Sequence, residues 1–352
     1  MSRPMRRLVA GSAVLAALLA GCASGSTPAA APSPSAPVAS ATPSPSTAAE
    51  RTTFRIASLK GPTTMGLVEL MDTAAKATAR HDYQVTVYGT PDEVVPKVLH
   101  GDVDVAMVPS NLAAVLYSKT KGTPAAVQVA AINTLGVLQV VEVGDTVHSL
   151  ADLRGRTIYS SGKGTTPQFV LEHLLAKNGL DPDSDVRVKY LSEPTQVAAQ
   201  LAAKHDAVAI LPQPFVTVAT AQIPGARAAL DLTDEWTKVT PDSQLVMGVA
   251  VVRAQFAAEH AAAMREFLED YAASAAYTNA HPVEAGALIA AAGVVPAAKV
   301  ATAAIPASHI TYVDGAKMHD ALAGYLGVLL AADPASVGGA LPGDDFYYGA
   351  GG

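Results

Sequence analysis

Short apolar runs alternate with amphipathic stretches along most of this chain, starting near residue 51. Apolar residues at residues 54–59, 84–88 and 103–108 predict three strands. Between them, residues 65–79 and 92–100 place apolar side chains at helical spacing and predict two helices. Short strands separated by helices of this length indicate parallel βαβ units and an α/β fold.

The same order of elements recurs about one hundred residues later. The segment KGPTT at residues 60–64, between the first strand and its helix, has a counterpart in KGTTP at residues 163–167. Likewise DVDVAMVP at residues 102–109 is echoed by DAVAILP at residues 206–212. Aligning the threonines of the first pair gives an offset of 102, and aligning the final prolines of the second gives 103. Because two separate motifs recur at nearly the same offset, the sequence predicts two lobes with the same topology. Chance similarity between short strands is the alternative.

The C-terminal third changes texture and becomes rich in alanine and helical patterns. An apolar strand is predicted at residues 245–252, followed by a long helix at residues 255–278. The chain's last aromatic residues, within DDFYY at residues 344–348, are expected to form a docked tail rather than a site.

Residues 1–50 do not read as part of a fold. Three arginines precede a short apolar stretch at residues 8–20, which ends in Leu-Ala-Gly-Cys22. This resembles the bacterial lipoprotein signal, and the resemblance implies cleavage after residue 21 and lipidation of Cys22 (a diacylglyceryl group and palmitate). An uncleaved anchor or a buried thiol is the alternative. Of residues 23–50, 25 of 28 are Ala, Ser, Pro or Thr, a composition that predicts a disordered tether.

Composition and charge exclude several classes of protein. A single cysteine excludes a disulfide scaffold and a multi-cysteine zinc or iron–sulfur site. A net charge of −7 counts against nucleic-acid binding, which normally needs a basic surplus. Aromatic residues make up only 5% and Trp236 is the one tryptophan, so a carbohydrate site built on stacked rings is poorly supported.

Three motifs together resemble the substrate-binding proteins of ABC importers, in the nitrate, sulfonate, taurine and thiamine-precursor branch that contains SsuA. They are KGPTT at residues 60–64, DVAMVPSN at residues 104–111 and DLRGRTI at residues 152–158. The resemblance implies a two-lobed periplasmic-binding-protein fold of the second type. Each lobe would be a mostly parallel sheet flanked by helices, and the chain would cross between lobes near residues 137–144 and 241–247.

The resulting domain organisation has four parts. Residues 1–21 are expected to be the lipoprotein signal peptide and residues 22–50 the tether. Residues 51–140 together with 246–352 are expected to form the first lobe, and residues 141–245 the second.

Polar residues at the carboxyl ends of the predicted strands are the candidate ligand-binding groups. In parallel α/β sheets ligands bind beyond those ends, and helix starts offer unpaired N–H groups to an anion or polar acceptor. Helix capping by the same side chains, without any ligand, is the alternative for each. Lys60 and Lys163 would add positive charge, or be simply solvated. The candidates are Thr63, Thr64, Ser110, Asn111, Thr134, Gly164, Thr165, Thr166 and Gln213.

Other catalytic chemistry finds little support in the sequence. The stretch at residues 162–165 lacks the G-x-x-x-x-G-K-[ST] spacing of a P-loop, and no G-x-S-x-G elbow is present. Nine histidines are scattered without an H-E-x-x-H motif or a close pair. Glu193 and Gln196 follow a predicted strand, where they either line the cleft or are solvated. We expect no cofactor and no resident metal.

Three functions from different classes follow. The first is a lipid-anchored, monomeric solute-binding protein on the extracytoplasmic face of the cell membrane, which captures a small polar or anionic molecule and delivers it to ABC permease and ATPase subunits. The second is a receptor that presents its ligand to a sensor protein. The third is an enzyme on the same fold, of the pyrimidine-precursor or menaquinone-pathway type. The export signal and the lack of a catalytic cluster favour a binding protein over an enzyme.

Overall fold

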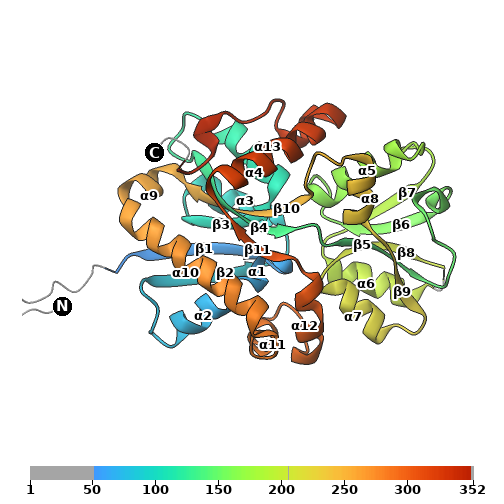
Figure 1. The fold of residues 1–352 in the computed structure, drawn as a ribbon, viewed down its shortest axis with the longest axis horizontal. Helices are drawn as coiled ribbons and strands as arrows, with labels where there is room; N and C mark the ends of the chain where they lie inside the picture. Colours follow the sequence, from blue (N-terminus) through green and yellow to red (C-terminus); the bar gives the residue numbers. More distant parts are fainter. Residues whose placement is uncertain (1–50, 205, 350–352) are drawn as a thin grey trace, which may run out of the picture. The chain divides into compact units, whose positions relative to one another are not determined.

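The computed structural model describes residues 51–204 and 206–349. The expected signal peptide, Cys22 and the tether lie outside the described residues. Two sheets organise the rest (Figure 1). The first sheet has the strand order β11-β4-β10-β3-β1-β2 and the second the order β7-β6-β8-β5-β9.

The strands of the first sheet are β1 (Thr53–Leu59), β2 (Asp82–Tyr88), β3 (Val105–Pro109), β4 (Val127–Leu135), β10 (Val246–Arg253) and β11 (Ile310–Val313). Those of the second are β5 (Leu138–Val143), β6 (Thr157–Ser161), β7 (Arg187–Leu191), β8 (Val208–Pro212) and β9 (Ala226–Asp231). The helices of the first half are α1 (Pro62–Met65), α2 (Val68–Ala75), α3 (Pro91–His100), α4 (Ser110–Thr120), α5 (Thr166–Lys177), α6 (Pro194–Ala203) and α7 (Phe215–Gln222). They are followed by α8 (Leu232–Val239), α9 (Ala254–Glu259), α10 (Ala261–Ala280), α11 (Pro282–Ala291), α12 (Ala298–Ala304) and α13 (Gly315–Ala332).

The two sheets share one topology. In the first, β1 pairs in parallel with β2 and β3, and β10 is antiparallel to β3. In the second, β6 pairs in parallel with β7 and β8, and β5 is antiparallel to β8. Helices cover both faces of each sheet; α5 and α8 lie on one side of the second sheet, α6 and α7 on the other (Figure 1). The predicted two-lobed α/β fold is confirmed.

The chain crosses between the sheets twice, and each antiparallel strand follows a crossing. The first crossing is short, because β4 ends at Leu135 and β5 begins at Leu138. A lobe boundary at residues 140/141 would cut β5, which lies wholly in the second sheet, so the sheets place this boundary near residues 136–137. The return occupies residues 240–245, between α8 and β10.

Two predicted helices are each divided in the structure. The helix expected at residues 65–79 corresponds to the end of α1 and to α2, with Gly66 and Leu67 between them. The helix expected at residues 255–278 is α9 and α10, because His260 leaves the helical region with φ −123° and ψ 40°. Both patterns are continuous in sequence and are interrupted in the structure, the second by one residue outside the helical region.

Apolar packing and one buried ion cluster fix the first lobe. Phe54 on β1 stacks on Phe267 of α10 with ring centroids 5.1 Å apart. At the amino end of β3, the carboxylate of Asp104 is 3% exposed and accepts hydrogen bonds from both Arg55 and Arg253. Burial would raise the pKa of this carboxyl group, but the guanidinium hydrogen bonds outweigh it and the net pKa is lowered.

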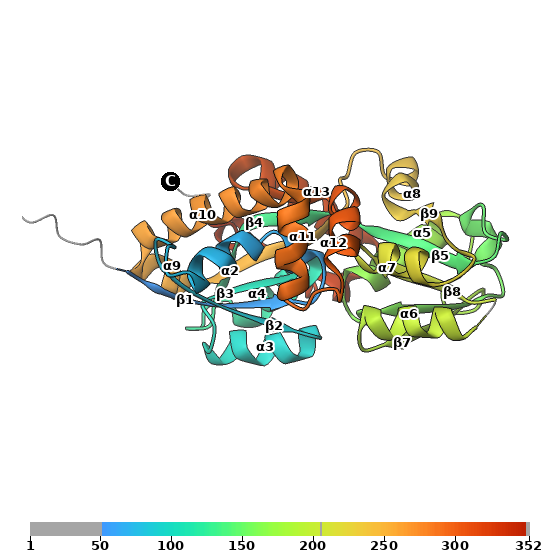
Figure 2. The same ribbon diagram turned by 90° about the horizontal axis from the view of Figure 1, so that it is seen from below.

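The C-terminal elements connect back to both lobes. The expected docked tail is present, since Phe346 is fully buried and Tyr347 forms a bridge to Val129 of β4. Helix α12 contacts α7 of the second lobe, and the two lie side by side in Figure 2. None of the helices in the described ranges is both long and apolar enough to span a bilayer.

Candidate functional site

A cavity of about 110 Å³ lies where the two sheets face each other. The repeated motifs meet in it: Thr63 and Pro109 line it from the first lobe, and Thr165 and Pro212 from the second. Because equivalent loops follow equivalent strands in the two lobes, the internal repeat places the same residue types on opposite walls. The volume is well below the roughly 300–1,000 Å³ of a drug-sized site, so the cavity fits a compact solute.

Hydroxyl groups and backbone dominate the polar part of this lining. Besides the threonines, Ser161 and Ser192 contribute hydroxyls, and Lys60 is the one ionisable side chain among the described residues that line the cavity. The remaining lining residues are glycines, prolines and aliphatic side chains. Such a lining offers hydrogen bonds and one positive charge, but no carboxylate or imidazole for acid–base work.

The loop before α5 is built around Gly162. This residue has φ +72°, and a β-carbon there would lie 2.6 Å from Thr165 Oγ1. The Thr165 hydroxyl donates to the Gly162 carbonyl oxygen at 2.6 Å, while the Gly164 N–H donates to the side chain of Gln168 at 2.8 Å. Thr165 therefore stabilises its own turn and also lines the cavity. Lys163 and Gly164 do not line it.

Thr63 and Thr64, the paired threonines of the first lobe, have different roles. Thr64 is fully buried, its hydroxyl donates to the Leu59 carbonyl oxygen at 2.6 Å, and it does not line the cavity. Thr63 is 9% exposed, makes a longer 3.2 Å hydrogen bond to the same oxygen, and lines the cavity. Thr64 anchors the loop to the end of β1, and Thr63 faces the cavity.

Ser110, Asn111 and Thr166 form a hydrogen-bond network between the lobes. Thr166 Oγ1, on α5, donates to Asn111 Oδ1 on α4 at 3.1 Å, and lies 3.3 Å from Ser110 Oγ. All three residues are completely buried. Ser110 also donates to the Val246 carbonyl oxygen, and Asn111 to the Ser336 carbonyl oxygen. We refer to these three residues as the interlobe network; of the three, Thr166 lines the cavity.

A buried tyrosine stands behind this network. The phenol of Tyr325, on α13, is fully buried and its hydroxyl makes no direct hydrogen bond. Burial raises the pKa of Tyr325, and the neighbouring Thr166 and Ser110 hydroxyls offset only part of that increase. The phenol therefore stays protonated beside the network at physiological pH.

Thr134 and Gln213 have different surroundings. Thr134 lines the cavity, and its hydroxyl donates to Asn133 Oδ1 at 2.9 Å. Gln213 does not line it; its side-chain oxygen accepts from the N–H and hydroxyl of Thr217, four residues on, at the start of α7. The geometry at Gln213 is that of the capping alternative.

The sequence reasoning missed several lining residues and one contact between lobes. Ser161 and Ser192 lie at the ends of β6 and β7, where the rule for parallel sheets could have found them. Glu193 does not line the cavity but packs on Gly89, where a β-carbon would lie 2.7 Å from its carboxylate. Gly89 thus permits close approach of the lobes, which the sequence gives no sign of.

Comparison with solved structures places this architecture in a known class. An ABC transporter protein from Parabacteroides distasonis is 22% identical, with a TM-score of 0.68 over 84% of this chain and 98% of its own. The aliphatic sulphonate binding protein SsuA from Escherichia coli is 17% identical, with a TM-score of 0.64 over 82% and 94%. SsuA from Xanthomonas axonopodis pv. citri, bound to MOPS, is 15% identical, with a TM-score of 0.64 over 84% and 96%. The fold is that of the two-lobed ABC-type periplasmic binding proteins, and the predicted resemblance is confirmed at this level.

Sequence comparison then gives the family. Residues 62–313 match the model of a family described as menaquinone biosynthesis, and the chain belongs to that family. No match was found among curated proteins.

Proposed function

We propose that this protein is a solute-binding protein that captures a small polar or anionic molecule between its two lobes and delivers it to an ABC importer. The observation that carries the proposal is the cavity between the lobes, with hydroxyls on both walls and Lys60 as its single ionisable side chain. Hydroxyl and ammonium donors suit the oxygen atoms of a small anion. The likeness in fold to sulphonate-binding proteins supports the same function.

Within this proposal the candidate residues have distinct roles. Thr63 and Thr165, which are slightly exposed, contact the solute, and Lys60 supplies charge; Thr134 and Thr166 lie in the cavity wall with their hydroxyls bonded to Asn133 and Asn111. The residues that do not line the cavity hold the loops or join the lobes instead. Those residues are Thr64, Ser110, Asn111, Gly164 and Gln213.

The mechanism is closure of the lobes around the solute. The interlobe network forms between α4 and α5, so it exists only when the lobes are this close. A solute that contacts both walls favours this arrangement by its differential affinity for it. The empty protein would then sample open arrangements that admit the solute.

We place the protein on the extracytoplasmic face of the cell membrane, anchored through a lipid on Cys22. The basic n-region, short apolar stretch and Leu-Ala-Gly-Cys22 support this placement. The test is Cys22→Ser: the protein should move from the membrane fraction to the soluble extracytoplasmic fraction. Retention of the variant in the membrane after signal cleavage would contradict the anchor.

The family match favours a second candidate, an enzyme that converts a small molecule of menaquinone biosynthesis. The cavity lining argues against acid–base catalysis there, because it includes no carboxylate or imidazole among the described residues. The two functions differ in what happens to the bound molecule. A binding protein returns it unchanged, and an enzyme returns a product.

One experiment separates them. The protein is screened by thermal shift with sulfonates, nitrate, pyrimidines and flavin precursors, and with the small-molecule fraction of a menaquinone-producing bacterium. Compounds that raise the melting temperature are incubated with the protein and recovered for mass spectrometry. Recovery of the same compound supports solute binding. Its turnover into a new compound supports the enzyme, and a complete lack of thermal shifts contradicts both.

A further inference from the structure

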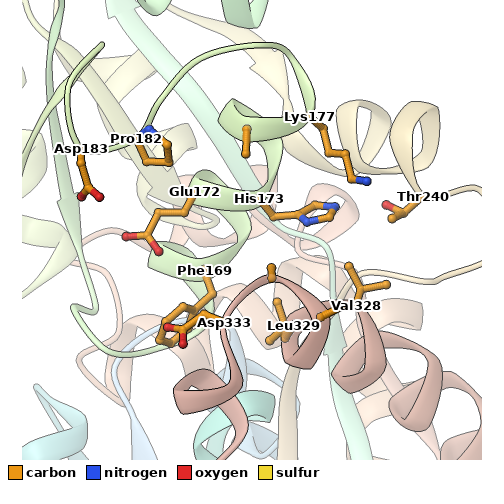
Figure 3. A pocket seen from close by; sticks show the side chains of 13 residues that line it. Phe169, Glu172, His173, Lys177, Pro182, Asp183, Thr240, Val328, Leu329 and Asp333 are labelled. Atoms are coloured by element: carbon orange, nitrogen blue, oxygen red, sulfur yellow. The ribbon is translucent and has the colours of Figure 1, made fainter.

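A second cavity, of about 640 Å³, lies on the hinge side of the molecule and shares no lining residue with the cleft cavity. Its walls are α5 of the second lobe and the last turns of α13, with Thr240 at the return crossing (Figure 3). We call this the hinge cavity. Its volume falls within the range of small-molecule sites, whereas the cleft cavity is far smaller.

The charges around the hinge cavity are predominantly negative. Glu172, Asp183 and Asp333 line it against a single Lys177. Burial raises the pKa of Glu172, and the charges of Asp183 and Asp333 raise it further, so the three carboxylates share one electrostatic field. Helix α13 ends at Ala332, which also lines the cavity, and a helix C-terminus adds partial negative charge.

The floor of the cavity is apolar but contains one polar group without a partner. Phe169, Val328 and Leu329 provide the apolar surface. His173 lines the cavity with its residue only 7% exposed, and its Nε2 is buried and makes no hydrogen bond. Figure 3 shows its ring extending from α5 toward the side where Lys177 and Thr240 lie.

Burial, and to a lesser degree Lys177, lowers the pKa of His173, so the imidazole is neutral at physiological pH. A buried ring nitrogen without a hydrogen-bond partner is unfavourable in either tautomer. The ring is held in place by packing on Trp236, with centroids 5.0 Å apart.

We propose that the hinge cavity binds an organic cation with an apolar body, of the arylalkylamine class. The ammonium group would lie among Glu172, Asp183 and Asp333, and the hydrocarbon part on Phe169 and Leu329. An aromatic floor also attracts a cation through its ring face. Since α5 and α13 belong to different lobes, the ligand contacts both of them. The site is separate from the proposed solute site in the cleft.

The test is an NMR titration of the full-length protein, with labelled histidines, against three probes of one shape. The probes are phenethylamine (cationic), 2-phenylethanol (neutral) and phenylacetate (anionic). Phenethylamine should bind at least ten-fold more tightly than the other two and should shift the ring signals of His173. Equal affinity for the three probes, or shifts confined to other histidines, would overturn the proposal.

Two variants and a control locate the binding. Glu172→Gln combined with Asp183→Asn should weaken phenethylamine binding at least ten-fold without weakening that of 2-phenylethanol. Ala332→Phe, at an exposed rim position, fills the cavity and should abolish binding of all probes. Asp320→Asn removes a charge from α13 away from the cavity and should have no effect. Unchanged amine binding in both test variants would refute the site.

Discussion

The interlobe network gives the sharpest prediction, because one isosteric substitution removes the Thr166 hydroxyl, which contacts both Ser110 and Asn111 across the lobes. Thr166→Val deletes the hydroxyl that donates to Asn111 Oδ1 at 3.1 Å and lies 3.3 Å from Ser110 Oγ. Both neighbours keep their other hydrogen bonds: Ser110 donates to the Val246 carbonyl oxygen, and Asn111 donates to the carbonyl oxygens of Ser336 and, across the lobes at 3.3 Å, Gly164. The fold of each lobe should therefore be unaffected.

The magnitude follows from the two contacts. A buried intramolecular hydrogen bond contributes about 0.5–1.5 kcal/mol net, and the 3.3 Å contact belongs at the weak end. The loss of both should destabilise the closed arrangement by about 1–2 kcal/mol, which is roughly a 5- to 30-fold change in the ratio of closed to open molecules. Because the solute binds the closed arrangement, its affinity should fall by up to the same factor.

The assay is the distance between spin labels, one on each lobe, measured by pulsed electron paramagnetic resonance. Labels at Lys119→Cys and Arg187→Cys, both exposed, are introduced in a Cys22→Ser background. The matched control is Thr120→Val, which removes an equally buried hydroxyl that bonds only within α4, to the Leu116 carbonyl oxygen. Thr166→Val should broaden the distances toward open values and Thr120→Val should not. Identical distributions would refute the role of the network in closure.

Three further predictions concern the loops and the core. In urea unfolding, Gly162→Ala should destabilise the protein by about 1–2 kcal/mol more than Gly164→Ala. Both glycines have positive φ, but only at Gly162 would a β-carbon collide with the Thr165 hydroxyl. Equal losses of stability in the two variants would contradict the role of that contact. Asp104→Asn should cost about 1–3 kcal/mol, because the buried side chain loses its charge-assisted hydrogen bonds to Arg55 and Arg253, whose guanidinium groups are partly exposed to solvent. The pKa of Asp104 is lowered in the folded protein, so its contribution to the free energy of unfolding is fully present above the ordinary value of 3.8 and is lost as the pH falls from there through the folded pKa. In acid unfolding, the wild type should therefore lose this stability and the variant should not. Lys60→Met should weaken binding of an anionic solute in calorimetry while leaving neutral solutes unaffected, and an equal effect on both would argue that the lysine is only packed.

Most of the parallel strands could be predicted from the sequence because βαβ units leave strong periodic signals. The repeat of KGPTT and KGTTP placed two loops in equivalent positions of the two lobes, and the sheets show that equivalence. The antiparallel strand β5 was predicted as part of a crossing instead, since an apolar run beside a hinge looks the same in either role. Edge strands β9 and β11 are short and half exposed, and their patterns are correspondingly weak.

The candidate site was harder to predict, for a physical reason. A threonine at a helix start has the same sequence signature whether its hydroxyl faces a ligand or caps the backbone. Only the geometry separates Thr63, which lines the cavity, from Thr64, which is fully buried. The contact between Thr166 and Asn111 joins residues 55 positions apart in different lobes, and no local pattern encodes it. The hinge cavity likewise depends on how α5 meets α13.

The unequal length of the two crossings determines how the lobes can move. One link is the two-residue segment between Leu135 and Leu138, and the other spans residues 240–245. At the short link, a β-carbon on Gly136 would lie 2.2 Å from Thr233 Oγ1, so α8 packs directly against the pivot. With one short and one longer connection, the lobes can rotate about the short connection, but they cannot easily slide past each other. A larger side chain at position 136 would push against α8 at this link. It would change the angle between the lobes without contacting the solute.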